Sequence, residues 1–218
     1  MEENFEEQIN QYCRSMSSPE SEFLQAIQDF TWKKMINPRM LTGHLQGQFL
    51  SMIIALKQPK TVLEIGTFTG YGTACLLENM PNDAVLHTIE ANAETASKTQ
   101  AFWRHLHQHH KVQWHVGDAL DIIPTLAIRP DLVYIDADKI NYKNYLDVCF
   151  DMIPSGGLLI FDNTLWSKRV INAQDIESDR DTKNMHEFNA YALGFEGLQS
   201  ILLPIRDGLT MLRKHEAL

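Results

Sequence analysis

The sequence predicts an α/β fold with a mostly parallel, seven-stranded sheet, N-terminal helices and an antiparallel C-terminal hairpin. From Thr61 onward, short apolar segments alternate with longer amphipathic segments, as in chains that alternate strands and helices. The apolar segments are nearly continuous, which is typical of parallel strands buried on both faces. Near the C-terminus, Arg206-Asp207-Gly208 separates two further apolar segments, and this pattern indicates a hairpin turn.

Residues 1–58 lack strand signals and are expected to form a helical cap on the remainder, 59–218, within a single domain. One helix is expected to start at Ser17-Ser18-Pro19-Glu20, where a capping Ser precedes Pro and an acidic residue. Asn37-Pro38 should end that helix. A further helix is predicted over His44–Lys57. Its apolar stripe is expected to consist of Leu45, Phe49, Met52, Ile53 and Leu56.

The remaining elements follow from the same patterns. The predicted strands are Thr61–Ile65, Ala84–Ile89, Val112–Val116, Leu132–Ile135, Leu158–Phe161, Leu198–Leu203 and Leu209–Arg213. The predicted helices between and after them are Gly70–Asn79, Ala93–His107, Ala119–Leu126, Tyr142–Met152 and, following the charged stretch Asp175–Lys183, Asn184–Phe195.

Length and composition restrict the class of protein. The 218 residues, 44% hydrophobic and 22% charged, are typical of one globular domain rather than a disordered chain. The net charge of −9 does not favour binding to a polyanion. No apolar run approaches the ~18 residues that a membrane span needs. The acidic N-terminus and three isolated cysteines, Cys13, Cys75 and Cys149, favour a cytoplasmic protein with reduced thiols.

The first two strand ends suggest a site for a nucleoside-type cofactor. Gly66, Gly70 and Gly72 follow the first strand and allow a tight turn close to a ligand, but their spacing is not GxGxxG. The carboxylate of Glu64 would tolerate a cationic ligand better than a pyrophosphate. Glu90 ends the second strand at about the distance expected for an acidic residue that binds ribose hydroxyls.

The fourth and fifth strand ends suggest a metal site. Asp136 follows one strand, and Asp162 and Asn163 follow the next, so their oxygens could converge at one edge of the sheet. Such hard ligands suit Mg²⁺, with Mn²⁺ and Ca²⁺ as alternatives, whereas isolated Asp and Asn residues are more often caps and turns. Lys139 lies beside this cluster and is a candidate general base.

A group of five histidines is a second possible set of metal ligands, and we set it aside. The group spans the end of a predicted helix and the start of a strand and has no second cluster at ligand spacing, which favours a solvated loop. Its members are His105, His107, His109, His110 and His115.

Four motifs in order resemble the cation-dependent O-methyltransferases, which include the caffeoyl-coenzyme A and catechol O-methyltransferases and their bacterial relatives. They are TVLEIGTFTGYG (61–72), TIEAN (88–92), VYIDADKINYKNY (133–145) and GGLLIFDNTLW (156–166). RMLTGHLQGQFLSMI (39–53) also matches this family, and LLPIRDGLTMLRK (202–214) is closer to its caffeoyl-coenzyme A branch. Ile201 aligns where the catechol enzymes have a substrate-contacting carboxylate.

The resemblance implies a Rossmann-like class I methyltransferase that uses S-adenosylmethionine. By position, Glu64 would meet the cofactor's ammonium and Glu90 its ribose, while Gly72 stands where the family often has serine. The methionine end would contact Thr42, Gly66 and Thr67, and the adenine would lie near Ala119 and Asp138. Asp136, Asp162 and Asn163 match the family's metal ligands, and Lys139 matches the base proposed for the catechol enzymes.

The expected activity is metal-dependent methylation of a small phenol with vicinal hydroxyls, by a homodimer. One alternative is a transfer RNA hydroxyuridine O-methyltransferase, which the acidic charge disfavours. The others are an NAD-type oxidoreductase and a non-catalytic nucleotide-binding module. The absence of GxGxxG and the presence of Asp162-Asn163 argue against the oxidoreductase, and a non-catalytic module would not need Lys139.

Overall fold

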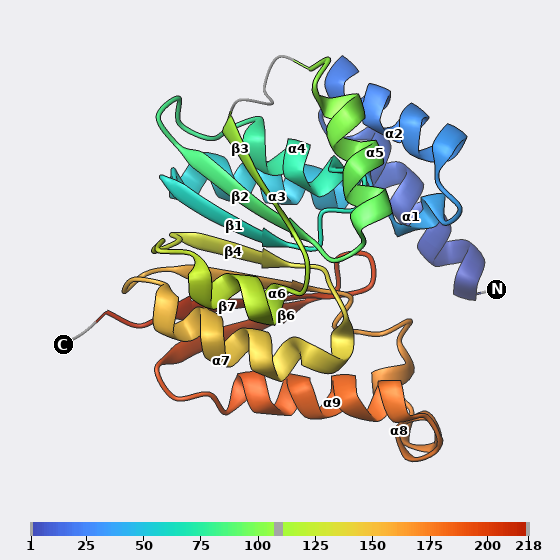
Figure 1. Cartoon of the computed structure of the whole chain (residues 1–218). Helices are drawn as coiled ribbons and strands as arrows, with labels where there is room; N and C mark the ends of the chain where they lie inside the picture. The colour runs from blue at the N-terminus through green and yellow to red at the C-terminus, as the bar shows by residue number, and fades with distance from the viewer. Residues whose placement is uncertain (1, 107–110, 217–218) are drawn as a thin grey trace.

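A computed structural model, which describes residues 2–106 and 111–216, contains the mostly parallel seven-stranded sheet that the sequence predicts (Figure 1). The strand order is β3-β2-β1-β4-β5-β7-β6. The first five strands are parallel, β7 is antiparallel to β5, and β6 pairs with β7 as the predicted hairpin. The strands are β1 (Thr61–Ile65), β2 (Val85–Glu90), β3 (Val112–Val116), β4 (Leu132–Ile135), β5 (Leu158–Asp162), β6 (Leu198–Leu203) and β7 (Leu209–Lys214).

Two helical layers cover the sheet, and alternate residues of each central strand serve one layer or the other. In β1, Val62 packs in the core that contains α2, α3 and α4, whereas Leu63 packs against α7 and α9. The helices are α1 (Glu2–Ser15), α2 (Glu22–Lys34), α3 (His44–Lys57), α4 (Tyr71–Leu77), α5 (Ala93–Trp103), α6 (Ala119–Ile122), α7 (Tyr142–Met152), α8 (Ala173–Ser178) and α9 (Arg180–Leu193). No described helix is long and apolar enough to span a membrane.

Two helix starts differ from the prediction. Helix α2 begins after Ser21, whose side chain accepts a hydrogen bond from Leu24 N, and not at Ser17-Pro19. Helix α9 begins after Asp179, whose carboxylate caps Thr182 N at 2.8 Å, and not at the predicted Asn184, so it includes the end of the charged stretch. A capping bond sets the first residue in both cases: α2 is capped by Ser21 and not by the predicted Ser17-Ser18 signal, and α9 is capped by Asp179.

The predicted apolar stripe of α3 is only partly right, since Phe49 and Ile53 do pack against the core. Met52 and Leu56 are 64% and 78% exposed, whereas Gln46, Leu50 and Ile54 are buried. A Cβ on Gly47 would lie only 2.7 Å from Cys75 Sγ, so this face of α3 packs closely on α4 through a small residue. A polar residue and a glycine therefore lie on the buried face, which a search for apolar stripes misses.

Candidate active site

A cavity of about 990 Å³ lies at the carboxyl ends of the parallel strands, where ligands of such sheets bind. All residues predicted for the cofactor, metal and base line it, although they come from distant parts of the chain. They are Thr42, Glu64, Gly66, Thr67, Gly72, Glu90, Ala119, Asp136, Asp138, Lys139, Asp162 and Asn163.

The turn after β1 requires glycine at its first position. Gly66 has φ +101°, and a Cβ there would lie 2.0 Å from the backbone oxygen of Asp136. The end of β1 can therefore approach the end of β4 only because this residue has no side chain. This approach brings the proposed cofactor and metal residues to the same cavity wall.

Glu64 is a fully buried carboxyl on this wall. Thr73 and Thr88 donate hydrogen bonds of 2.5 and 2.6 Å to its Oε2, while Oε1 has no partner among the described residues. Burial raises the pKa of Glu64 to about 8, although the two threonine bonds oppose this shift. A buried, unpartnered carboxylate oxygen beside Gly72 fits a cationic group such as an ammonium.

Backbone and side-chain donors orient the two other predicted carboxylates on the cofactor side. Glu90 accepts hydrogen bonds from Phe68 N at 2.8 Å and from Asn92 N at 2.9 Å. Asp138 accepts one from the Tyr145 hydroxyl and one from the Asn141 amide, each at 2.5 Å. Both carboxylates are thus fixed at the cavity, with lone pairs left for further donors.

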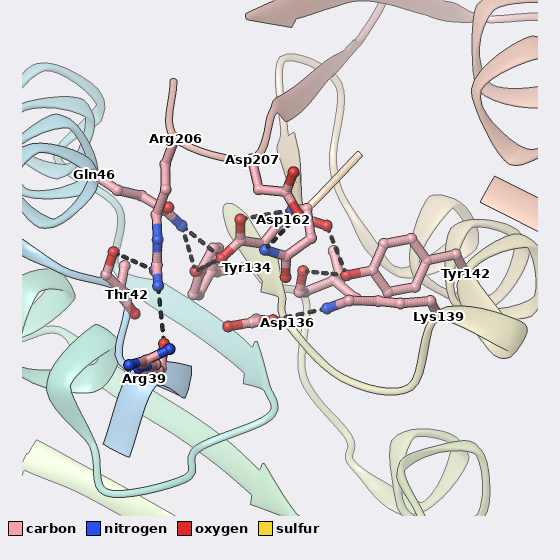
Figure 2. Close-up of polar contacts among 12 residues, drawn as sticks. Arg39, Thr42, Gln46, Tyr134, Asp136, Lys139, Tyr142, Asp162, Arg206 and Asp207 are labelled. Carbon is pink, nitrogen blue, oxygen red and sulfur yellow. Dashed lines mark hydrogen bonds and ion pairs between the residues drawn. The ribbon is translucent and has the colours of Figure 1, made fainter. Parts of the chain in front are cut away.

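Asp162, drawn with its hydrogen-bond partners in Figure 2, is the most buried of the predicted metal ligands. Its Oδ2 accepts hydrogen bonds from Gln46 Nε2 at 2.6 Å and from the Tyr134 hydroxyl at 2.9 Å, and its Oδ1 accepts one from Asn163 N at 2.6 Å. Burial and the nearby Asp136 carboxylate raise the pKa of Asp162 above its ordinary value. A cation beside these carboxylates would relieve their repulsion.

Asp136 is paired with the predicted base. Lys139 Nζ lies 2.8 Å from Asp136 Oδ1 and 5.1 Å from the centre of the Tyr142 ring. The described residues contain no group of three or more His, Cys, Asp or Glu that could hold a metal. The predicted ligand set is of a different composition, because it consists of two carboxylates and the side-chain amide of Asn163. Their oxygen chemistry fits a hard cation.

Sequence reasoning missed four side chains that support this site. Gln46 and Tyr134 contact Asp162, Arg206 donates to the Thr42 carbonyl at 2.6 Å, and Asp207 accepts from Ser167 N at 2.5 Å. Arg206 and Asp207 belong to the turn that predicted the hairpin, but nothing local indicates their contacts.

The histidines set aside as metal ligands, so far as the structure describes them, lie away from the cavity. His115 Nε2 is 3.1 Å from His87 Nδ1 on the neighbouring strand, and neither these residues nor His105 lines the cavity. His107, His109 and His110 lie outside the described residues.

Comparisons with known proteins agree with this architecture. Caffeoyl-CoA O-methyltransferase 1 of Nicotiana tabacum is 29% identical over 205 residues, which cover 89% of this chain and 85% of that protein. The O-methyltransferase TomG of Streptomyces achromogenes, involved in tomaymycin synthesis and solved with S-adenosylmethionine, superposes with a TM-score of 0.82 at 26% identity, covering 96% of each chain. The S-adenosylhomocysteine-bound methyltransferase PaMTH1 of Podospora anserina shares the fold, with a TM-score of 0.91 at 21% identity, covering 99% of this chain and 97% of that one.

The sheet order and the antiparallel hairpin are those of a class I methyltransferase. The sequence model of the O-methyltransferase family matches residues 14–215, and the chain belongs to that family. It is an S-adenosylmethionine-dependent O-methyltransferase.

Proposed function

We propose that the protein methylates a small phenol with two vicinal hydroxyls, such as a catechol or a caffeoyl-like ester, and that it needs a divalent cation. The convergence of Asp136, Asp162, Asn163 and Lys139 on the cavity that Glu64 also lines carries this proposal. The named activity of its tobacco relative on caffeoyl-CoA supports the acceptor class. We treat residues 1–58 as the helical cap of one methyltransferase domain that spans 1–218.

On the cofactor side, S-adenosylmethionine supplies an electrophilic methyl group. Glu64 binds the ammonium through the oxygen that has no partner among the described residues. Glu90 binds the ribose, and Ala119 and Asp138 border the adenine. Thr42, Gly66, Thr67 and Gly72 contact the methionine end; all of these side chains and turns line the cavity.

On the acceptor side, Asp136, Asp162 and Asn163 hold Mg²⁺, or Mn²⁺ or Ca²⁺ in its place. Bound there, the cation supplies a positive charge that lowers the pKa of an acceptor hydroxyl. Lys139 then accepts the acceptor's proton at Nζ. Its ion pair with Asp136 at 2.8 Å keeps this nitrogen at the site.

The test is methyl transfer from labelled S-adenosylmethionine to a catechol panel, with bulk transfer RNA as a separate arm. We expect turnover of catechols with Mg²⁺ or Mn²⁺, loss of turnover with chelator and recovery on adding metal back. Asp162→Ala should remove metal dependence and most turnover, while the affinity for S-adenosylhomocysteine stays nearly unchanged. Full activity in chelator would refute the cation, and labelled RNA without labelled catechol would refute the acceptor class.

A further inference from the structure

The turn between β6 and β7 contacts two walls of the cavity that are far apart in sequence. Figure 2 shows Arg206 of this turn beside Thr42 and Arg39. One wall is the segment 39–42, which includes Thr42, a residue of the proposed cofactor site. The other is the segment 163–168, which begins with the proposed metal ligand Asn163. Arg206 and Asp207 are consecutive in this turn, and each contacts a different wall.

Arg206 contacts the first wall through two backbone carbonyls. Its Nη1 donates to the Thr42 oxygen at 2.6 Å, and its Nη2 donates to the Arg39 oxygen at 3.1 Å. A planar guanidinium can satisfy both carbonyls at once, whereas an ammonium is a single point of charge. The Thr42 hydroxyl is close to Gly72 of the proposed cofactor site, since a Cβ on Gly72 would lie 3.3 Å from it.

Asp207 contacts the second wall, which has an unfavourable backbone conformation. Asn163, Trp166, Ser167 and Lys168 all have φ between +50° and +63°, a region that costs energy for residues other than glycine. Asp207 Oδ1 accepts from Ser167 N at 2.5 Å, and its backbone oxygen accepts from Leu165 N at 2.8 Å. These bonds hold the segment in the conformation that presents Asn163.

Asp207 also reaches Asn163 itself. The Asn163 amide nitrogen lies 3.5 Å from Asp207 Oδ2, a long contact that turns the amide oxygen away from Asp207. A metal ligand whose other end is held in this way depends on that partner for its orientation.

We infer that Arg206 and Asp207 are a pair of positioning residues with separate tasks, an inference that rests on the proposed function. Arg206 fixes the wall that borders the cofactor, and Asp207 fixes the segment that carries the metal ligand Asn163. Loss of Asp207 should therefore weaken metal binding, whereas loss of Arg206 should weaken cofactor binding.

The test uses the full chain and two equilibrium measurements that need no turnover. Free Mn²⁺ is followed by electron paramagnetic resonance, and S-adenosylhomocysteine binding by calorimetry. Asp207→Ala should weaken Mn²⁺ binding by about tenfold or more while changing S-adenosylhomocysteine affinity by less than about twofold. Arg206→Ala should do the opposite.

Conservative variants separate positioning from general loss of structure. Asp207→Asn keeps an oxygen for Ser167 N and should retain most of the Mn²⁺ affinity. Arg206→Lys can reach one carbonyl but not both, so its S-adenosylhomocysteine affinity should lie between those of Arg206→Ala and the native chain. If an alanine variant fails to fold, its conservative variant is compared directly with the native chain.

Equal effects of both changes on both ligands, or no effect of either, would overturn the inference. A native chain that binds no Mn²⁺ would instead refute the proposed metal centre and the task of Asp207, and the task of Arg206 would still be decided by S-adenosylhomocysteine binding. Failure of the inference alone is therefore recognisable, because the native chain then binds Mn²⁺ and the variants do not separate.

Discussion

Gln46 Nε2 donates a hydrogen bond of 2.6 Å to Asp162 Oδ2, across 116 residues of sequence and inside the protein. The same amide nitrogen lies 3.0 Å from the Tyr134 hydroxyl, which itself donates to Asp162 (Figure 2). If the Gln46 amide were flipped, its oxygen would face the Asp162 carboxylate and the two negative groups would repel. The amide therefore has one favourable orientation. Helix α3 is thus tied directly to a proposed metal ligand.

Gln46→Leu should destabilise the protein because it leaves a buried carboxylate with one donor fewer. We expect the free energy of unfolding to fall by about 1–3 kcal/mol. Denaturant unfolding in the presence of a metal chelator measures this change. Gln48→Leu is the matched control, since Gln48 is on the same helix but is not buried, and it should shift the free energy by less than about 0.5 kcal/mol. Equal shifts in the two variants would contradict the role of Gln46.

Lys139→Met should lower turnover while leaving metal binding intact. Removing a general base typically costs about 10²–10⁴-fold in rate. Because Lys139 neutralises Asp136 when no cation is bound, its loss should keep Mn²⁺ affinity equal or raise it. Turnover should partly recover at higher pH, where more of the acceptor is ionised in water. Lys143→Met, with the partly exposed Lys143 paired to Glu187, is the control, and a similar loss of rate there would refute the assignment.

Cofactor binding should release protons from the protein at neutral pH. With a pKa of about 8, Glu64 is mostly protonated at pH 7, and an ammonium beside it favours the ionised form. S-adenosylhomocysteine, which keeps this ammonium, should therefore displace up to about one proton per site. Calorimetry in two buffers of different ionisation enthalpy measures the release. Glu64→Gln should abolish it, and identical enthalpies in both buffers for the native chain would contradict the prediction.

The same pKa shift fixes the sign of a stability change. Glu64 has a higher pKa folded, about 8, than its ordinary value of 4.5. Its favourable contribution to the free energy of unfolding is therefore complete below pH 4.5, and it is lost as the pH rises through about 8. Without cofactor, the native chain should lose more stability over this range than Glu64→Gln.

The strands, and the position of the predicted site residues around one cavity, could be predicted from sequence because both depend on local patterns. Strands such as Leu132–Ile135 are continuous apolar runs, and topology then brings their carboxyl ends, with Asp136 and Asp162, to one edge. The roles of Gln46 and Asp207 could not be found in this way. Their partners lie 116 and 40 residues away, and each follows from tertiary packing that leaves no periodic signal. The buried face of α3 was predicted only in part, because it includes Gln46 and Gly47, which add nothing to an apolar pattern.

Gly72→Ala should weaken cofactor binding and stability together. A Cβ there would lie 2.9 Å from Glu64 Oε1 and 3.3 Å from both Thr42 Oγ1 and Tyr134 Cε1. Glu64 has little freedom to move, because its other oxygen is held by Thr73 and Thr88. We expect a loss of about 1–3 kcal/mol in the free energy of unfolding, together with weaker S-adenosylhomocysteine binding.

Gly194→Ala is the control for this change, measured by the same unfolding and calorimetry. Gly194 has φ −85°, and its added Cβ would meet nothing closer than 3.5 Å. An alanine there should be neutral or slightly stabilising. If Gly72→Ala binds S-adenosylhomocysteine as tightly as this control, the crowded position beside Glu64 does not constrain the cofactor.

The exposed apolar side chains of α1 and α3 favour the proposed homodimer, because the two helices contact each other and leave these groups uncovered. They are Phe5, Ile9, Tyr12, Met52 and Leu56. Light scattering should show a dimer at micromolar concentration, and Leu56→Arg should shift it toward monomer by placing a charge in the interface. Leu193→Arg is the control, since Leu193 is 75% exposed on α9, against the opposite face of the sheet, and should leave the dimer intact. A native chain that is monomeric, or a dimer that only Leu193→Arg dissociates, would show that the N-terminal helices are not the interface.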